Sequence, residues 1–207
     1  MAAFLSGATE AQLRYWRRAR EGEPPLLKPG VASQPRALYS YRDLIVLRTF
    51  AHLREQVSLQ TIRRMVTWLE ENVTDGKDLS ERTLRPIPEK RSIAYFDDDG
   101  QIVDVGREPG QYSHRLVMED IFRPFVNLHG DEVPDFTHPA DGLLVDPEIC
   151  GGIPVVDGTR IPFNLIAGLA RDGLSLEAIQ LFYPGVPAEA VKGAAELADR
   201  IDYARAA

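Results

Sequence analysis

The sequence is poor in cysteine and in long apolar runs, and both shortages exclude classes of protein. Cys150 is the single cysteine among 207 residues, so neither an internal disulfide nor a cysteine-ligated zinc site is expected. No stretch approaches the roughly 20 consecutive apolar residues that a membrane-spanning helix needs. The N-terminus has no basic segment followed by an apolar one, as a secretory signal would have. We therefore expect a cytoplasmic protein that does not contact membranes.

Motifs for catalysis are also missing. The four histidines, at positions 52, 114, 129 and 138, include no pair four residues apart that could bind a metal from one helix face. The sequence contains neither a Gly-x-Ser-x-Gly element nor a His-Glu-x-x-His element. It therefore predicts neither an enzyme nor a bound metal or cofactor.

What is present is an ordinary globular composition with unevenly distributed charge. Hydrophobic residues make up 44% of the chain and charged residues 27%, enough for one or two domains with apolar cores. The net charge is −7, but residues 1–91 hold 16 Lys and Arg against 11 Asp and Glu, whereas residues 92–207 hold 8 against 20. Most of the N-terminal basic residues are arginines, whose planar guanidinium suits phosphates and base edges. This pattern indicates nucleic-acid binding by the N-terminal part, with a merely solvated helix face as the alternative.

A short helix and a proline-rich loop are predicted at the start of the chain. Residues 8–20 form the helix, with Thr9 as its N-cap and with Leu13 and Trp16 on one buried face. Residues 22–37 contain four prolines and two glycines, which cannot continue a helix. This second segment is expected to be a loop that includes a short ribbon around a turn.

Two longer helices are predicted next. Ser40 is the expected N-cap of the first, where Asp43 completes an approximate capping box, and Ser58 begins the second. Both segments carry apolar residues at helical spacing, which predicts one buried face on each. These residues are Leu44, Ile45, Leu47, Phe50, Ala51 and Leu53 in the first helix, and Leu59, Ile62, Met65, Val66 and Leu69 in the second.

Three motifs in this region occur in a characteristic order. They are Leu-Arg-Tyr-Trp at 13–16, Arg-x-x-Tyr-Ser-x-x-Asp-Leu at 36–44 and Ser-Leu-x-x-Ile-Arg at 58–63. With this order and spacing, the segment resembles the DNA-binding domain of the MerR family. The resemblance implies a winged helix-turn-helix whose second helix enters the major groove of DNA. Only seven residues precede Ala8, so the first helix of that arrangement is expected to be nearly absent.

The resemblance implies two groups of DNA contacts. Side chains of the 8–20 helix would face the major groove or its flanking phosphates, and side chains of the wing and of the next helix N-terminus would bind phosphates. Trp16 and Tyr39 are expected to pack in the core rather than to stack on bases. The expected DNA-binding residues are Thr9, Gln12, Arg14, Tyr15, Arg17, Arg18, Lys28, Arg36 and Arg42.

Residues 76–141 are expected to connect two domains. The polar, proline-containing stretch 72–91 is interpreted as a linker, and residues 126–141 as a second one. Between them, residues 92–105 predict a β-hairpin, because alternating apolar residues flank an Asp/Gly turn. The three aspartates at 97–99 are interpreted as turn residues, since a calcium loop needs ligands spaced along twelve positions.

The last third of the chain predicts three short helices joined by tight turns. They span 162–172, then Ser175 through Phe182, then 188–204, and Gly173 ends the first of them. This pattern is typical of a trihelical, helix-turn-helix-like domain. The fold class predicted for the whole chain is therefore mainly α with small β elements, and residues 142–207 form its C-terminal domain.

A second resemblance lies just before and within these helices. Asp146-Pro147 is followed by Gly-x-Pro-x-x-x-Gly-Thr-Arg-Ile at 152–161 and by Gly-Leu-Ser at 173–175. This segment resembles the small VapB-like antitoxin family, over about 60 residues. Genes of that family commonly adjoin one for a PIN-like ribonuclease toxin, so the resemblance implies an antitoxin.

Partner-binding residues are also expected in this domain. Val155 and Val156 could form an edge strand that pairs with a second subunit or with the toxin. Arg160 is interpreted as a structural hydrogen-bond donor near this strand. Arg200 and Arg205 are candidates for reaching an acidic metal centre of the toxin.

The sequence as a whole predicts the antitoxin of a type II toxin–antitoxin pair. Residues 1–75 would bind operator DNA and repress the protein's own operon, and residues 142–207 would bind and neutralise the PIN-like ribonuclease. A homodimer is expected, because paired half-sites one helical turn apart require two-fold symmetry. Two alternatives stay open: a stand-alone MerR-like regulator that senses a small ligand, and an adaptor whose N-terminal part no longer binds DNA.

Overall fold

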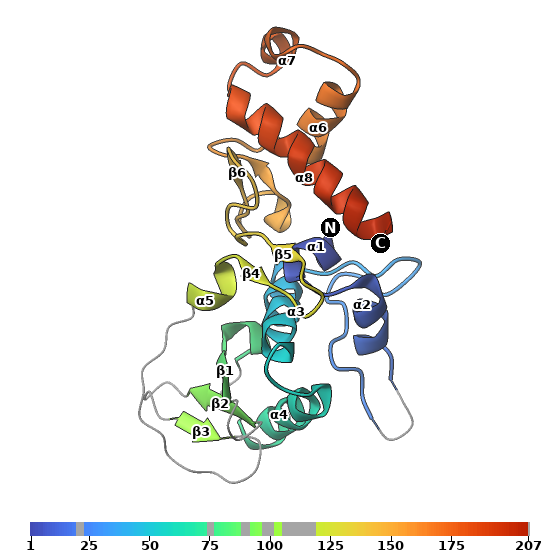
Figure 1. Cartoon of the computed structure of the whole chain (residues 1–207), viewed down its shortest axis with the longest axis vertical. Helices are drawn as coiled ribbons and strands as arrows, with labels where there is room; N and C mark the ends of the chain where they lie inside the picture. Colours follow the sequence, from blue (N-terminus) through green and yellow to red (C-terminus); the bar gives the residue numbers. More distant parts are fainter. Residues whose placement is uncertain (20–22, 74–76, 88–91, 97–101, 105–118, 207) are drawn as a thin grey trace.

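The computed structural model describes residues 1–19, 23–73, 77–87, 92–96, 102–104 and 119–206. Within these ranges the protein is mainly helical and has small antiparallel sheets, which confirms the expected mainly-α class with small β elements (Figure 1). No helix among the described residues is long and apolar enough to cross a membrane.

The N-terminal helices begin where the capping residues predicted. The Thr9, Ser40 and Ser58 side chains each accept a hydrogen bond from the backbone N–H three residues later. A five-residue helix also precedes Thr9, so the first helix is short but present. The four helices are α1 (Ala2–Ser6), α2 (Glu10–Trp16), α3 (Tyr41–Arg54) and α4 (Leu59–Asn72).

A three-stranded antiparallel sheet follows α4. It consists of β1 (Thr83–Ile87), β2 (Ser92–Phe96) and β3 (Ile102–Asp104), in the order β1-β2-β3, after the 3-10 turn η1 (Leu79–Glu81). The pairing of β2 with β3 confirms the predicted hairpin, although its acidic turn at 97–99 lies outside the described residues. The interpretation of 72–91 as a linker was wrong for 83–87, because β1 pairs along its length with β2 and buries Leu84.

The expected second linker is also folded. It follows α5 (Glu119–Phe122) and contains the strands β4 (Phe125–Val126) and β5 (Glu132–Val133), which pair as a hairpin. Phe136 comes directly after this hairpin and is fully buried. The segment therefore forms structure because Phe136 joins the core around α3 and Val133 is buried against the turn between α1 and α2.

Arg48 fixes this segment to the N-terminal helices. Its buried guanidinium donates hydrogen bonds to the carbonyl oxygens of Leu5 and Pro134 at 2.7 and 2.6 Å. It also donates to three successive carbonyls, those of Ile121, Phe122 and Arg123. The carbonyls come from α1, from α5 and from the chain on either side of the β4–β5 hairpin, so one side chain joins all of them to α3.

The C-terminal helices match the prediction within two residues at each end. Gly173 has the left-handed φ of 85° that favours glycine, and it follows α6 directly after the capping residue Asp172. The elements of this unit are β6 (Leu143–Leu144), the 3-10 turn η3 (Cys150–Gly152), β7 (Val155–Val156), α6 (Phe163–Arg171), α7 (Leu176–Phe182) and α8 (Ala188–Ala206).

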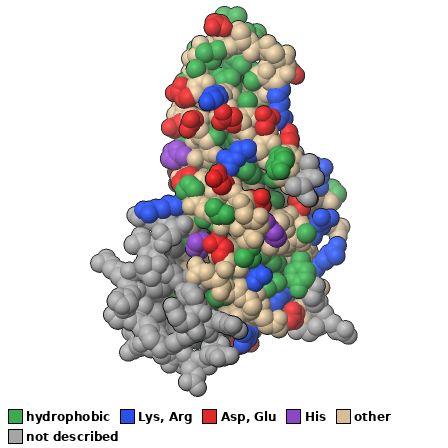
Figure 2. Space-filling model, viewed as in Figure 1, with side chains coloured by type: hydrophobic (Ala, Val, Ile, Leu, Met, Phe, Trp, Pro, Cys, Tyr) green, Lys and Arg blue, Asp and Glu red, His purple; other side chains and the backbone are tan. Residues whose placement is uncertain are grey.

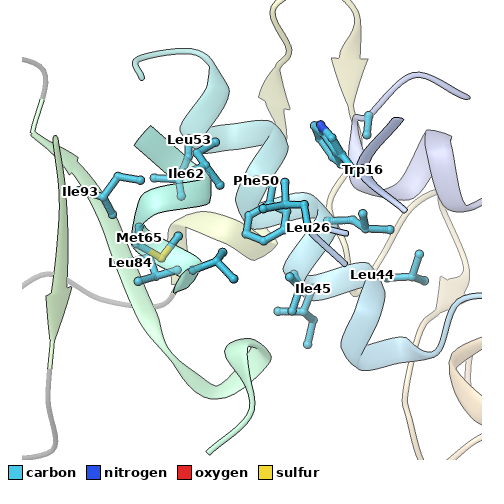
Figure 3. Close-up of a cluster of buried hydrophobic side chains, with 14 of the residues drawn as sticks. Trp16, Leu26, Leu44, Ile45, Phe50, Leu53, Ile62, Met65, Leu84 and Ile93 are labelled. Carbon is cyan, nitrogen blue, oxygen red and sulfur yellow. The ribbon is translucent and has the colours of Figure 1, made fainter. Parts of the chain in front are cut away.

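Two hydrophobic cores organise the described chain. The larger one centres on α3 and collects side chains from α2, α4 and the three-stranded sheet, including Trp16, Phe50 and Met65 (Figure 3). The smaller one lies between α6, α7 and α8. Phe4 of α1 and Met1, the N-cap residue of this helix, pack against both cores, so the start of the chain joins the two units.

Candidate nucleic-acid interface

The turn between α1 and α2 is built around a glycine. Gly7 adopts a φ of 75°, and a Cβ placed there would lie 2.6 Å from Val133 Cγ2. Only glycine fits both the left-handed backbone and this close approach. Two residues later the Thr9 side chain accepts from the N–H of Gln12, and Gln12 Oε1 accepts from the N–H of Thr9. This reciprocal capping box fixes the start of α2.

The same pairing limits what Thr9 and Gln12 can do. Each uses a side-chain oxygen to satisfy a backbone N–H at the helix start, so both residues act first as caps. The amide nitrogen of Gln12 and the hydroxyl proton of Thr9 are not used in the cap. Thr9 and Gln12 can therefore still donate hydrogen bonds to DNA, but their side-chain oxygens are occupied by the cap.

The inner face of α2 is anchored in the larger core. Leu13 and Trp16 are buried, and the Trp16 ring meets Phe50 of α3 edge-on with ring centroids 6.0 Å apart. The interpretation of Trp16 as a core residue is confirmed. Its carbonyl also accepts hydrogen bonds from the N–H groups of Leu26 and Leu27, at 2.7 and 3.3 Å. The proline-rich loop is thereby tied to the end of α2.

The loop contains the predicted ribbon in a shorter form. Ala32 and Leu38 exchange backbone hydrogen bonds, and Val31 also donates to Leu38. The ribbon was expected between the stretches 26–30 and 36–40; Leu38 lies in the second of these, but its partners Val31 and Ala32 follow the first. The tip between the paired residues carries Arg36, which is exposed.

Four basic side chains of this region project outward. Arg14 and Arg18 at α2 and Lys28 and Arg36 on the loop are exposed. Figure 2 shows Lys and Arg side chains along the right-hand edge of the lower half of the molecule, where α2 and the loop lie in Figure 1. Acidic side chains instead predominate over the upper part, formed by the C-terminal helices. We call the four exposed residues Arg14, Arg18, Lys28 and Arg36 the basic edge.

The other expected DNA-binding side chains are engaged within the protein. The Arg63 guanidinium lies 5.8 Å from the centre of the half-buried Tyr15 ring. Burial raises the pKa of Tyr39, and a hydrogen bond with Arg17 opposes part of that rise. Arg42 pairs with Glu81 at 3.2 Å. Tyr15, Arg17 and Arg42 thus have internal partners that the sequence pattern did not indicate.

The expected free edge at β7 does not exist. Val155 and Val156 are fully buried and pair with β6 on one side. On the other side, Val156 donates to the carbonyl of Ile161 and Pro154 accepts from Phe163. Both edges of this short strand are occupied within the chain, so the expectation that it adds to a partner's sheet is corrected.

The three C-terminal arginines expected to bind a partner have different surroundings. Arg160 is exposed, and no hydrogen bond or ion pair of its guanidinium occurs among the described residues, so it is not the structural donor expected. Arg200 lies 4.9 Å from the centre of the Phe4 ring and donates to the Glu132 carbonyl at 3.3 Å. It therefore connects α8 to α1 and β5. The side chain of Arg205 lies outside the described residues.

Sequence reasoning missed Arg48 and Arg63. Both are basic residues in helices otherwise rich in apolar side chains, at positions that the apolar pattern places on or beside the buried face. Arg63 pairs with Glu23 at 3.6 Å and donates to the carbonyl of Pro24, so it also holds the loop that follows α2. A basic residue among apolar residues at helical spacing could have predicted these internal contacts, because a buried arginine is almost always paired.

The chain is similar to known proteins over part of its length. Residues 144–198 match the family described as "Protein of unknown function (DUF433)". The chain is 29% identical over 86 residues to "Uncharacterized protein y4eO" of Sinorhizobium fredii, an alignment that covers 42% of this chain and 38% of the relative. The chain thus spans under half the length of this relative. No solved structure matches.

Proposed function

We propose that this protein is a DNA-binding antitoxin, which represses its own operon through α2 and the adjoining loop and neutralises a PIN-like ribonuclease through its C-terminal unit. The observation that carries the DNA-binding part is the basic edge. Its four cations are exposed on α2, directly after α2 and on the adjoining loop, which backbone hydrogen bonds tie to the end of α2. The likeness of the C-terminal segment to VapB-like antitoxins supports the second part.

The geometry of the basic edge suits a duplex. α2 follows α1 after a short turn and its apolar face is buried, while Arg14 on its outer face and Arg18 just after it can bind phosphates or guanine edges. The loop beside it presents Lys28 and Arg36, which suit the flanking DNA backbone. The acidic C-terminal unit would be repelled by DNA, so a bound duplex is expected to lie against the basic edge alone.

The DNA-binding part is tested by fluorescence anisotropy with the duplex directly upstream of the protein's own gene. We expect the logarithm of the binding constant to fall with the logarithm of salt concentration by about 0.9 per neutralised phosphate. The double variant Arg14→Ala/Arg18→Ala should weaken binding and lower this slope by about 0.9 for each arginine.

Arg160→Ala is the matched control, because it removes an exposed arginine from the C-terminal unit. Binding of that variant should equal wild type. Absence of any binding at about 50 mM salt would contradict the proposal and favour the adaptor alternative. The mass of the free protein and of the complex by light scattering then tests the expected homodimer.

The antitoxin part needs a separate experiment. The product of the adjoining gene is purified, and its cleavage of RNA is followed with increasing amounts of this protein. Stoichiometric inhibition is the expected result. Undiminished cleavage at excess protein would refute the antitoxin role and leave the ligand-sensing regulator as the better hypothesis.

A further inference from the structure

The C-terminal end of α7 exposes two adjacent large apolar side chains. Leu181 is 78% exposed and Phe182 is 68% exposed. The helix does not need them for its own position, because Ile179 fills the smaller core and Gln180 donates to the carbonyl of Val186 at 2.9 Å. Ser175 caps its start. Two apolar side chains left this far outside the core are a feature of interaction sites.

The stretch of chain that contains this end is acidic. Residues 172–191 contain three acidic residues, Asp172, Glu177 and Glu189, and no lysine or arginine. The two basic residues that flank the stretch are already paired, Arg171 with Asp199 and Asp202 and Lys192 with Glu196. All three carboxylates are exposed. A second copy of this chain seated on the same patch would bring two sets of carboxylates together, and that repulsion opposes self-association. A partner with a basic rim would instead be attracted.

We propose that Leu181 and Phe182 insert into an apolar pocket rimmed by Lys and Arg on a basic protein partner. The inference rests on the proposed function, under which this partner is the ribonuclease. An enzyme that binds RNA needs a basic surface, and the acidic surround of Leu181 and Phe182 complements it. An aromatic side chain in a desolvated pocket is the usual centre of such an interface.

The position of α7 lets both partners bind together. In Figure 1, α7 lies at the top of the molecule, and α8 runs from its neighbourhood down towards α1 and α2. Hydrophobic side chains are visible at this end in Figure 2, with acidic side chains beside and below them. The basic edge is thus well separated from Leu181 and Phe182. A ternary complex of DNA, this protein and its partner is therefore expected.

The test is calorimetric titration of this protein with the product of the adjoining gene. We expect Leu181→Ser/Phe182→Ser to weaken binding at least tenfold, because the apolar contact is lost. Glu177→Lys/Glu189→Lys should also weaken binding and reduce its salt dependence. Leu181→Ser/Phe182→Ser should keep the wild-type melting midpoint and DNA affinity, because both side chains are exposed and distant from α2. Glu177→Lys/Glu189→Lys should lower the melting midpoint slightly, because the two carboxylates lie in the first turns of α7 and α8, but it should remain folded at the temperature of the titration.

The matched control is Val126→Ser/Leu128→Ser, which removes two other exposed apolar side chains, 54% and 47% exposed, near the β4–β5 turn. It should bind the partner as wild type does. If wild type binds but Leu181→Ser/Phe182→Ser binds within about twofold of it, the inference fails while the antitoxin proposal stands. If wild type does not bind the partner, both fail. If the double variant converts a dimer into a monomer by light scattering, the occupant is a second copy and the inference is overturned.

Discussion

Replacing Arg48 tests whether one buried guanidinium holds the N-terminal unit together. Its side chain is fully buried and donates to five carbonyl oxygens. It also lies 5.0 Å from the centre of the Phe125 ring and 5.6 Å from that of Phe136. Burial lowers the pKa of Arg48 to about 10, so it remains charged at neutral pH. Arg48→Met keeps most of the volume but removes every donor.

The expected loss follows from what the carbonyls and the charge each contribute. A hydrogen bond to a charged group contributes about 1.5–3 kcal/mol, and five are lost. Burying the Arg48 charge costs several kcal/mol of desolvation in the wild type. Arg48→Met avoids this cost, so the net loss of stability is smaller than the sum of the five hydrogen bonds. We expect a net loss of about 3–5 kcal/mol in the free energy of unfolding. For a chain of this size, that lowers the melting midpoint by about 10 °C.

The assay is urea unfolding followed by far-UV circular dichroism. Arg64→Met is the control, because Arg64 is an exposed residue of α4 and its loss should change stability by under about 0.5 kcal/mol. The stability of Arg48→Lys should lie between that of wild type and that of Arg48→Met. The lysine keeps the charge, but its compact ammonium cannot contact all the carbonyls that the wider, planar guanidinium reaches. A loss below about 1 kcal/mol for Arg48→Met would refute the reasoning.

Two further predictions concern backbone packing and pH. Gly193→Ala should cost about 1–3 kcal/mol or more in thermal unfolding, because the new Cβ would lie 2.1 Å from the carbonyl oxygen of Asp141. Gly168→Ala, where the added Cβ meets nothing within 4 Å, should stabilise by about 0.5–1 kcal/mol, and equal effects at the two sites would contradict this packing. Burial alone would raise the pKa of Asp135, but hydrogen bonds from His138 and Thr137 outweigh it and hold that pKa below its ordinary value of 3.8. The stability that these hydrogen bonds confer is therefore fully present above pH 3.8, and it is lost as the pH falls through the lower pKa of Asp135 in the folded state. Asp135→Asn should therefore flatten the acidic part of a plot of unfolding free energy against pH. An unchanged acid limb would rule this contribution out.

The helices were predictable because their signals are local. Caps at Thr9, Ser40, Ser58 and Ser175 depend on a side chain and a backbone N–H three residues apart, so the sequence contains both partners. The 92–105 hairpin has the same character, because its turn and its alternation lie within a few residues. The strands β1, β4 and β5 were missed, since their pairing depends on partners and on core contacts that the local pattern does not specify.

The candidate interface was predictable only as a set of residue types. Arg14, Arg18, Lys28 and Arg36 were expected to face outward, and the structure places all four there. Arg17, Arg42 and Tyr15 looked equivalent in the sequence but have partners elsewhere in the chain. Val155 and Val156 read as a free edge because the residues that cover them, at 143–144 and 161–163, are distant or follow a turn.

By itself the sequence determined where the capped helices begin and which half of the chain is basic, although the helix expected over 8–20 ends at Trp16. Each of these depends on neighbours within about four residues or on a count of charges. Only the tertiary structure decided which arginines connect segments that are distant in the sequence. Arg48 and Arg200 show why: their partners lie 73 and 68 residues away along the chain, at Ile121 and Glu132, and come within hydrogen-bonding distance only after folding.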